Sequence, residues 1–122
     1  MKIRTHRELD VYKLAFQVAV EIYKLSITFP KNETYSLTDQ IRRSSRSVCA
    51  NTAEAFRKRK YPKHFVSKLS DSEAEAAETQ VWLDFALEFG YITKAQFELL
   101  DETYNNIIGK LVNMSNQPEK WS

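Results

Sequence analysis

The fold is decided by residues 36–60, which read SLTDQIRRSSRSVCANTAEAFRKRK. At about 100° per residue, small and apolar side chains recur along one side of a helix, as at Leu37, Ile41 and Val48. Arginines occupy the other side, and a basic run from Arg57 to Lys60 ends the stretch. This pattern predicts a helix that buries one face in a bundle and presents charge on the other.

The composition favours one all-helical domain over residues 1–122. Two glycines and three prolines are too few for a turn-rich β protein, and 43% hydrophobic residues are too many for a disordered chain. No apolar run approaches the ~20 residues that cross a bilayer, and the N-terminal residues lack the apolar core of a secretion signal. A single cysteine, Cys49, leaves no internal disulfide to form. We therefore expect a cytoplasmic protein without membrane contact.

Hydrophobic periodicity predicts four helices, over about residues 5–28, 36–60, 62–89 and 93–114. Thr5 with Glu8, and Thr93 with Gln96, have the spacing of capping boxes at the start of the first and fourth helices. Gly90 suits the position that ends the third helix. Because short connections imply antiparallel neighbours, the predicted fold is all-α, an antiparallel up-down four-helix bundle.

Two segments depart from a simple bundle pattern. The apolar stripe of the first helix is wider than one face, so we expect it to be buried on two sides or to form a subunit interface. From Asn113 the periodicity is lost, and we expect the tail to Ser122 to be frayed.

Charge is distributed unevenly along a chain whose net charge is only +2. Residues 35–64 hold eight lysines and arginines against two acids, a net charge of +6. Residues 65–104 hold two lysines against nine acids, a net charge of −7. Two interpretations follow. Either the two segments pair with each other, within or between subunits, or the basic segment binds a polyanion.

A set of motifs in the second and third helices is typical of one known family. Phe29-Pro30 is followed by QIRRS at 40–44, by NTAE at 51–54 and, in the third helix, by ETQ at 78–80 and FGYI at 89–92. Over residues 7–112 the chain resembles the four-helix bundle proteins encoded by intervening sequences in bacterial 23S ribosomal RNA genes, the S23 or IVP family.

The resemblance implies an oligomer as well as a fold. Family members are commonly ring-shaped homopentamers, and a related branch, the accessory variability determinant of diversity-generating retroelements, is a basic pentamer that associates with a reverse transcriptase and nucleic acid. This sequence departs from the common pattern at Ala55, where a glycine usually follows Ala-Glu, and at residues 71–74, DSEA, where many members show Gly-Ser.

The candidate nucleic-acid-binding residues are the cations of the second helix, namely Arg42, Arg43, Arg46, Arg57, Lys58, Arg59 and Lys60. Clustered cations release counterions from phosphate backbones. The competing interpretation pairs them with carboxylates. Glu75 or Glu78 would meet the mid-helix arginines across a bundle or subunit contact. We expect the terminal run, Arg57 to Lys60, to be the part available to a polyanion.

Patterns for catalysis and metal binding are weak. Neither His6 nor His64 follows a glutamate by three residues, as a di-iron bundle requires, so we expect no metal and no cofactor. Arg59 and His64 have the Arg-x4-6-His spacing of the HEPN ribonucleases, which makes an RNase the third interpretation. Cys49 has no nearby histidine and is expected to be a packing residue.

The sequence therefore predicts a non-enzymatic homo-oligomer, with a pentamer implied by the resemblance. It is expected to bind RNA, DNA or a ribonucleoprotein through a basic surface and to have no small-molecule substrate. The alternative is a structural assembly or protein-partner adaptor without nucleic-acid contact, in which the arginines serve subunit contacts.

Overall fold

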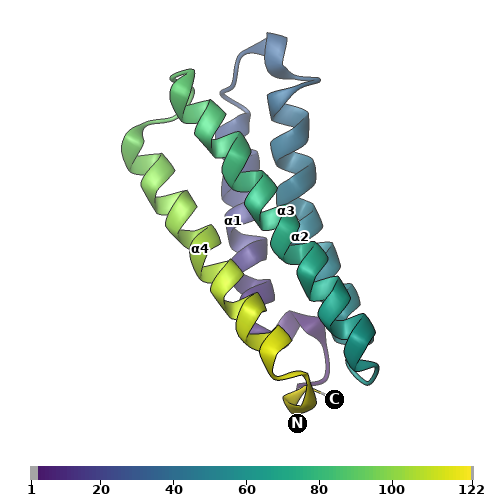
Figure 1. Cartoon of the computed structure of the whole chain (residues 1–122). Helices are drawn as coiled ribbons and strands as arrows, with labels where there is room; N and C mark the ends of the chain where they lie inside the picture. The colour runs from purple at the N-terminus through teal and green to yellow at the C-terminus, as the bar shows by residue number, and fades with distance from the viewer. Residues whose placement is uncertain (1–2, 122) are drawn as a thin grey trace.

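The computed structural model describes residues 3–121, in which every regular element is helical. Short turns join the four helices α1 (Asp10–Ser26), α2 (Leu37–Arg57), α3 (Pro62–Glu88) and α4 (Lys94–Asn116). Each helix turns back along the one before it, and α1 closes the bundle against α4 (Figure 1). The predicted all-α four-helix fold is confirmed for this range. Residues 1, 2 and 122 of the predicted domain lie outside it.

The first helix begins later than predicted because its capping signal belongs to a separate turn. The capping box of Thr5 and Glu8 is present, but it closes η1 (His6–Glu8), a single 3-10 turn. Leu9 then adopts an extended conformation (φ −70°, ψ 129°), and α1 starts at Asp10. The Leu9 side chain is 2% exposed, so burial in the core accompanies this break in the helix.

The other predicted boundaries need smaller corrections. α2 ends at Arg57 rather than Lys60, because Lys58 leaves the helical region (φ −98°, ψ 10°). Gly90 has φ +76°, a left-handed conformation that favours glycine, and it ends α3 as predicted. The frayed tail is wrong as far as Trp121. α4 continues to Asn116, η3 (Pro118–Lys120) follows, and Trp121 packs against the core.

The most extensive interface, between α2 and α3, contains fully buried hydroxyl groups. Ser72 Oγ donates to the carbonyl oxygen of Val48 at 2.9 Å and lies 2.8 Å from Thr52 Oγ1. Further along the same interface, Thr79 Oγ1 donates to Ser44 Oγ at 2.8 Å. The small side chains let the two helices approach closely, and each hydroxyl keeps a hydrogen-bond partner despite its burial.

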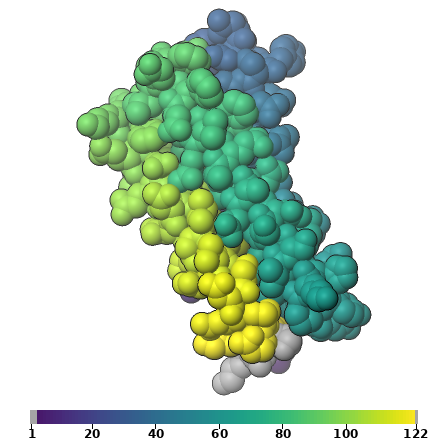
Figure 2. Space-filling view, viewed as in Figure 1, coloured from purple at the N-terminus to yellow at the C-terminus, as the bar shows by residue number. Residues whose placement is uncertain are grey.

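The two ends of the bundle contain different segments of the chain. Both termini lie at the end where α2 joins α3, and Figure 1 shows the short loop of η2 (Lys31–Glu33) at the opposite end. η1 packs against α2 and η3 packs against α3, and both terminal segments lie at the same end of the bundle as the basic α2–α3 turn (Figure 1). Figure 2 shows α3 and α4 side by side over one elongated face. Within residues 3–121, no helix is both long enough and apolar enough to cross a membrane.

Candidate functional site

Arg43 of α2 is held by two carboxylates of α3. Its Nη1 lies 3.0 Å from Glu75 Oε2, and its Nη2 forms an ion pair with Glu78. Hydrogen bonds to Glu75 and then Glu78 raise the pKa of Arg43 above its usual value. The pairing of helix-two arginines with helix-three acids is therefore confirmed for Arg43, and it lies within one chain.

The electrostatics of Glu75 reflect a balance of two effects. Burial acts to raise the pKa of Glu75, but hydrogen bonds from Arg43 and Ser47 outweigh it and leave this pKa below its usual value. The carboxylate is thus ionised at neutral pH and remains a partner for Arg43. Its side chain is 20% exposed against 46% for Arg43, so the pair is only partly shielded from water.

Arg42 and Arg46 have different partners from Arg43. Arg42 Nε donates to Ser26 Oγ at 2.7 Å, and the Arg42 guanidinium lies 4.7 Å from the centre of the Tyr23 ring. Arg46 lies 5.8 Å from the same ring centre. Across residues 3–121, neither arginine forms an ion pair with a carboxylate. Both cations therefore lie beside α1 with their charge uncompensated.

The end of α2 contains the least engaged cations of the predicted site. The side chains of Arg57, Lys58 and Lys60 are exposed and form no ion pair within the described part of the chain. Lys60 Nζ lies 5.6 Å from the centre of the exposed Tyr61 ring. Lys63, in the first turn of α3, is also exposed without an ion pair between residues 3 and 121.

Arg59 differs from its neighbours because its side chain contacts the last turn of α2. Its Nη1 donates to the Phe56 carbonyl oxygen at 2.9 Å, and its guanidinium lies 4.0 Å from the centre of the Phe56 ring. His64, its partner in the ribonuclease interpretation, makes an edge contact with Tyr61 at 6.2 Å between ring centres. The two side chains are thus directed to separate partners.

The fold brings both terminal segments, with their cations, to the same end of the bundle as this turn. Together they form the basic end, which we define as Arg4, Arg7, Arg57, Lys58, Lys60, Lys63 and Lys120. Glu8, Asp10 and Glu119 also lie in the terminal segments. Glu8 accepts the backbone N–H groups of Arg4 and Thr5 at 2.9 and 3.0 Å, and these bonds lower its pKa. The α2–α3 turn itself, residues 57–63, carries five cations and no acid.

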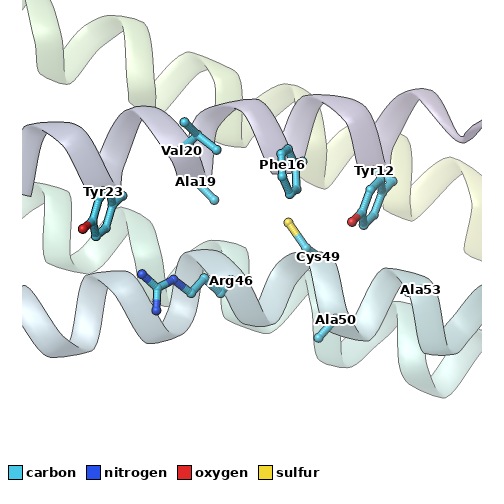
Figure 3. Close-up of a pocket in the computed structure, with 9 residues that line it drawn as sticks. All are labelled: Tyr12, Phe16, Ala19, Val20, Tyr23, Arg46, Cys49, Ala50 and Ala53. Carbon is cyan, nitrogen blue, oxygen red and sulfur yellow. The ribbon is translucent and has the colours of Figure 1, made fainter. Parts of the chain in front are cut away.

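A groove of about 560 Å³ runs between α1 and α2. Figure 3 shows Tyr12, Phe16 and Tyr23 of α1 facing α2 across this space, with Arg46 near one end. Phe16 is 52% exposed, so the expectation that α1 is buried on two sides is wrong within the chain. The α1–α2 groove is an apolar surface flanked by the uncompensated charge of Arg42 and Arg46.

The sulfur of Cys49 faces the same groove (Figure 3). Burial raises the pKa of the Cys49 thiol to about 11, and its Sγ lies 3.9 Å from the Ser45 carbonyl oxygen. A thiol with this pKa is almost wholly neutral at pH 7 and is a poor nucleophile. These properties fit the packing role that the sequence predicts for Cys49.

A second apolar surface, the α3 ridge, consists of Val81, Phe85 and Phe89, which are 44%, 45% and 52% exposed. The ring centres of Phe85 and Phe89 lie 5.8 Å apart, and the contacts continue to Trp82 and Tyr91. Asp84 and Glu88, on the same side of the helix, are exposed and form no ion pair in the described range. The α3 ridge is therefore apolar with acidic margins.

Comparison with known proteins places the chain in a family. The model of the family described as 23S rRNA-intervening sequence protein matches residues 7–113. The chain belongs to this family. A similar solved structure is the crystal structure of a protein of unknown function from the S23 ribosomal protein family of Bacteroides thetaiotaomicron VPI-5482. It is 28% identical, with a TM-score of 0.78, and the match covers 87% of this chain and 95% of that one. No curated protein gives a significant match.

In this member of the 23S rRNA-intervening sequence protein family, the seven predicted site residues separate into two groups. Arg42, Arg43 and Arg59 form hydrogen bonds or ion pairs with the chain itself. Arg46, Arg57, Lys58 and Lys60 are exposed and form no ion pair in the described range, and the last three of them lie at the basic end. Sequence reasoning missed the contribution of the termini, because only the fold brings the segments that contain Arg4 and Lys120 to the same end of the bundle as the α2–α3 turn. It also missed the α3 ridge, whose signal was the extra apolar residues in the second half of that helix.

Proposed function

We propose that this protein is a non-enzymatic, ring-shaped homo-oligomer of the bacterial cytoplasm that binds RNA or DNA, alone or in a ribonucleoprotein, through its basic end. The number of subunits that the family resemblance implies is five. The proposal includes no cofactor, metal or small-molecule substrate.

One observation carries the nucleic-acid part of this proposal. Four neighbouring cations, Arg57, Lys58, Lys60 and Lys63, are exposed and have no carboxylate partner in residues 3–121. By contrast, Arg43 has two carboxylate partners, and Lys68 pairs with Glu54 at 3.2 Å and Asp71 at 3.5 Å. Uncompensated cations at close spacing favour a polyanion, because each neutralised phosphate releases condensed counterions.

The α1–α2 groove and the α3 ridge support the assembly part. The first is a groove between α1 and α2, the second is a row of exposed side chains on α3, and both are apolar. Their margins have opposite charge, since Arg42 and Arg46 flank the groove while Asp84 and Glu88 flank the ridge. Insertion of one subunit's ridge into the next subunit's groove would be a heterologous contact, which forms a ring when the rotation closes.

Assembly of this kind increases the strength of nucleic-acid binding. Cyclic symmetry places equivalent ends of all subunits at the same rim of a ring, so the basic ends would form one continuous cationic rim. A polyanion that is bound to one subunit is held at high effective concentration near the next subunit. Its overall affinity therefore rises without any new type of contact. We therefore expect dissociation of the oligomer to weaken nucleic-acid binding even though every basic residue remains.

The salt dependence of binding tests the proposal. Labelled RNA and DNA oligonucleotides are titrated with protein from about 50 to about 200 mM salt, and affinity is followed by fluorescence anisotropy. Replacing Arg57 and Lys58 by alanine should flatten the slope of log affinity against log salt by about 0.7–0.9 for each phosphate that these cations no longer neutralise. The matched control is Lys94→Ala at the start of α4, which removes an exposed cation far from the basic end.

Two results would contradict the nucleic-acid proposal. The first is that the wild-type oligomer fails to bind either nucleic acid at about 50 mM salt. The second is that Lys94→Ala reduces the slope as much as the paired substitution does. Either result, with an intact oligomer in light scattering, would favour the alternative of a structural assembly or protein-partner adaptor.

A further inference from the structure

A second hollow, with a volume of about 550 Å³, lies at the basic end between the N-terminal segment and the end of α4. Its floor is apolar, because the side chains of Leu9, Val11 and Met114 are 2%, 2% and 6% exposed. Ile3 and the half-buried Trp121 also line it. The hollow therefore offers an aromatic side chain beside an apolar floor, with Lys120 of the basic end in its lining.

We call this hollow the terminal pocket. Its rim is formed by polar and charged side chains. Lys110 and Lys120 are exposed cations, and the exposed amides of Asn113, in the last turn of α4, and of Gln117, the residue after the helix, also line the pocket. Because both amides line the same hollow, one ligand could contact both. Glu8 of η1 and Asp10, at the start of α1, add two carboxylates to the same lining.

This combination matches the chemistry of an unpaired nucleotide. A base has an apolar face that stacks on an aromatic ring, an edge that exchanges hydrogen bonds with amides and carboxylates, and a phosphate that attracts cations. An aliphatic ligand would leave the two amides and Asp10 unused. A base held in a duplex cannot reach the pocket, because both of its faces are stacked and its edge is paired.

We propose that the terminal pocket takes one unpaired nucleotide, with its base against Trp121 and its phosphate near Lys110 and Lys120. This inference deepens the proposed function, because the basic end supplies the neighbouring phosphate contacts. The pocket makes the protein selective for single strands, loops or bulges over continuous duplex. The selectivity is separate from the salt-dependent attraction, which does not distinguish paired from unpaired nucleic acid.

Tryptophan fluorescence tests the pocket directly. The chain has two tryptophans, so Trp82→Phe leaves Trp121 as the only one. Nucleoside monophosphates should quench this fluorescence in a saturable way, whereas ribose 5-phosphate and inorganic phosphate, which lack a base, should not. In the same background, replacing Lys110 and Lys120 by alanine should weaken the monophosphate titration about tenfold, and Lys94→Ala should not change it.

Oligonucleotide binding gives a second, independent measurement. Trp121→Ala should weaken single-strand binding between about 5-fold and about 100-fold, the range expected for loss of one base–aromatic stack. Duplex binding should change less than twofold. Asn113→Leu keeps Trp121 and should reduce the preference for single strand over duplex, so the inference does not depend on the folding of one variant.

The outcomes separate this inference from the proposed function. Equal affinity for single strand and duplex, with no quenching of Trp121 by monophosphates, overturns the pocket and leaves salt-dependent binding intact. Quenching by monophosphates without salt-dependent binding of oligonucleotides supports the pocket and overturns the proposed function. Equal quenching by ribose 5-phosphate shows an anion site without base recognition, which also overturns the inference.

Discussion

Arg43 and Glu75 join α2 to α3, the two helices with the most extensive interface, through an ion pair of 3.0 Å. The same guanidinium also binds Glu78, whose Oε2 accepts a hydrogen bond from Trp82 Nε1 at 3.0 Å. The ion pairs of Arg43 thus lie beside Trp82, whose ring contacts Phe85 of the α3 ridge. Arg43 satisfies carboxylates of its own chain, and this explains why it does not belong with the exposed cations of the basic end.

A double-mutant cycle should detect this contact as coupling between Arg43→Ala and Glu78→Ala. Because nearly half of the Arg43 side chain is exposed, we expect a coupling free energy of only about 0.5–1 kcal/mol. Urea unfolding of the wild type, both single variants and the double variant measures it. Arg57→Ala combined with Glu78→Ala is the control and should be additive. Additive effects in the Arg43 cycle would contradict an intrachain role for this arginine.

The depressed pKa of Glu75 predicts a specific dependence of stability on pH. Its folded-state pKa lies below the ordinary value of 4.5, so its contribution is complete above that value and is lost as pH falls through the folded pKa. The difference in unfolding free energy between the wild type and Glu75→Gln should therefore shrink on acidification from about pH 6 to about pH 3. Urea titrations across this interval test the sign, which a constant or growing difference would refute.

The sequence predicted the helices well and the site only in part, for identifiable reasons. Periodicity and the Thr93 capping box located α3 and α4, since both signals are local. The start of α1 was wrong because Thr5 caps a separate turn and the extended Leu9 is stabilised by tertiary burial. The sequence also left the partners of Arg43 open between bundle and subunit contacts, because helical spacing does not tell which carboxylates lie opposite.

Charge introduced into the two apolar surfaces should reveal how subunits meet. Phe16→Glu damages only the α1–α2 groove and Phe85→Glu damages only the α3 ridge, so each variant alone should lose the wild-type oligomer. An equimolar mixture of the two should form a one-to-one dimer, because one intact groove and one intact ridge remain. Light scattering and analytical ultracentrifugation measure the masses.

Leu99→Glu provides the control for this mixing experiment. Leu99 on α4 is 67% exposed and belongs to neither apolar surface, so the variant should keep the wild-type mass. A mixture in which both variants stay monomeric would contradict insertion of the ridge into the groove. Oligomers of unchanged size in both single variants would place the interface elsewhere on the chain.

The buried hydroxyls between α2 and α3 should tolerate removal better than enlargement. Ser72→Ala leaves Thr52 with the Val48 carbonyl oxygen at 2.7 Å, so we expect a loss of about 1 kcal/mol in unfolding free energy. Ser72→Leu inserts a larger side chain into a fully buried site and should cost about 1–3 kcal/mol or more. Thermal and urea unfolding measure both losses.

The neighbouring exposed serine supplies the matched control. Ser70 lies on the solvent side of α3, so Ser70→Leu should change the unfolding free energy by less than about 0.5 kcal/mol. If Ser72→Leu were as mild as Ser70→Leu, close approach of α2 and α3 would not depend on small residues.

The position of the two termini has a practical consequence for studying this protein. Both lie at the end of the bundle that carries the α2–α3 turn (Figure 1). A purification tag or fluorescent protein fused to either terminus would cover the cations of that end, and a polyhistidine tag would add its own affinity for phosphate. The loop around η2, at the far end, is the better insertion point for a reporter. Measurements on untagged protein are the proper reference for any weak binding seen with a fusion.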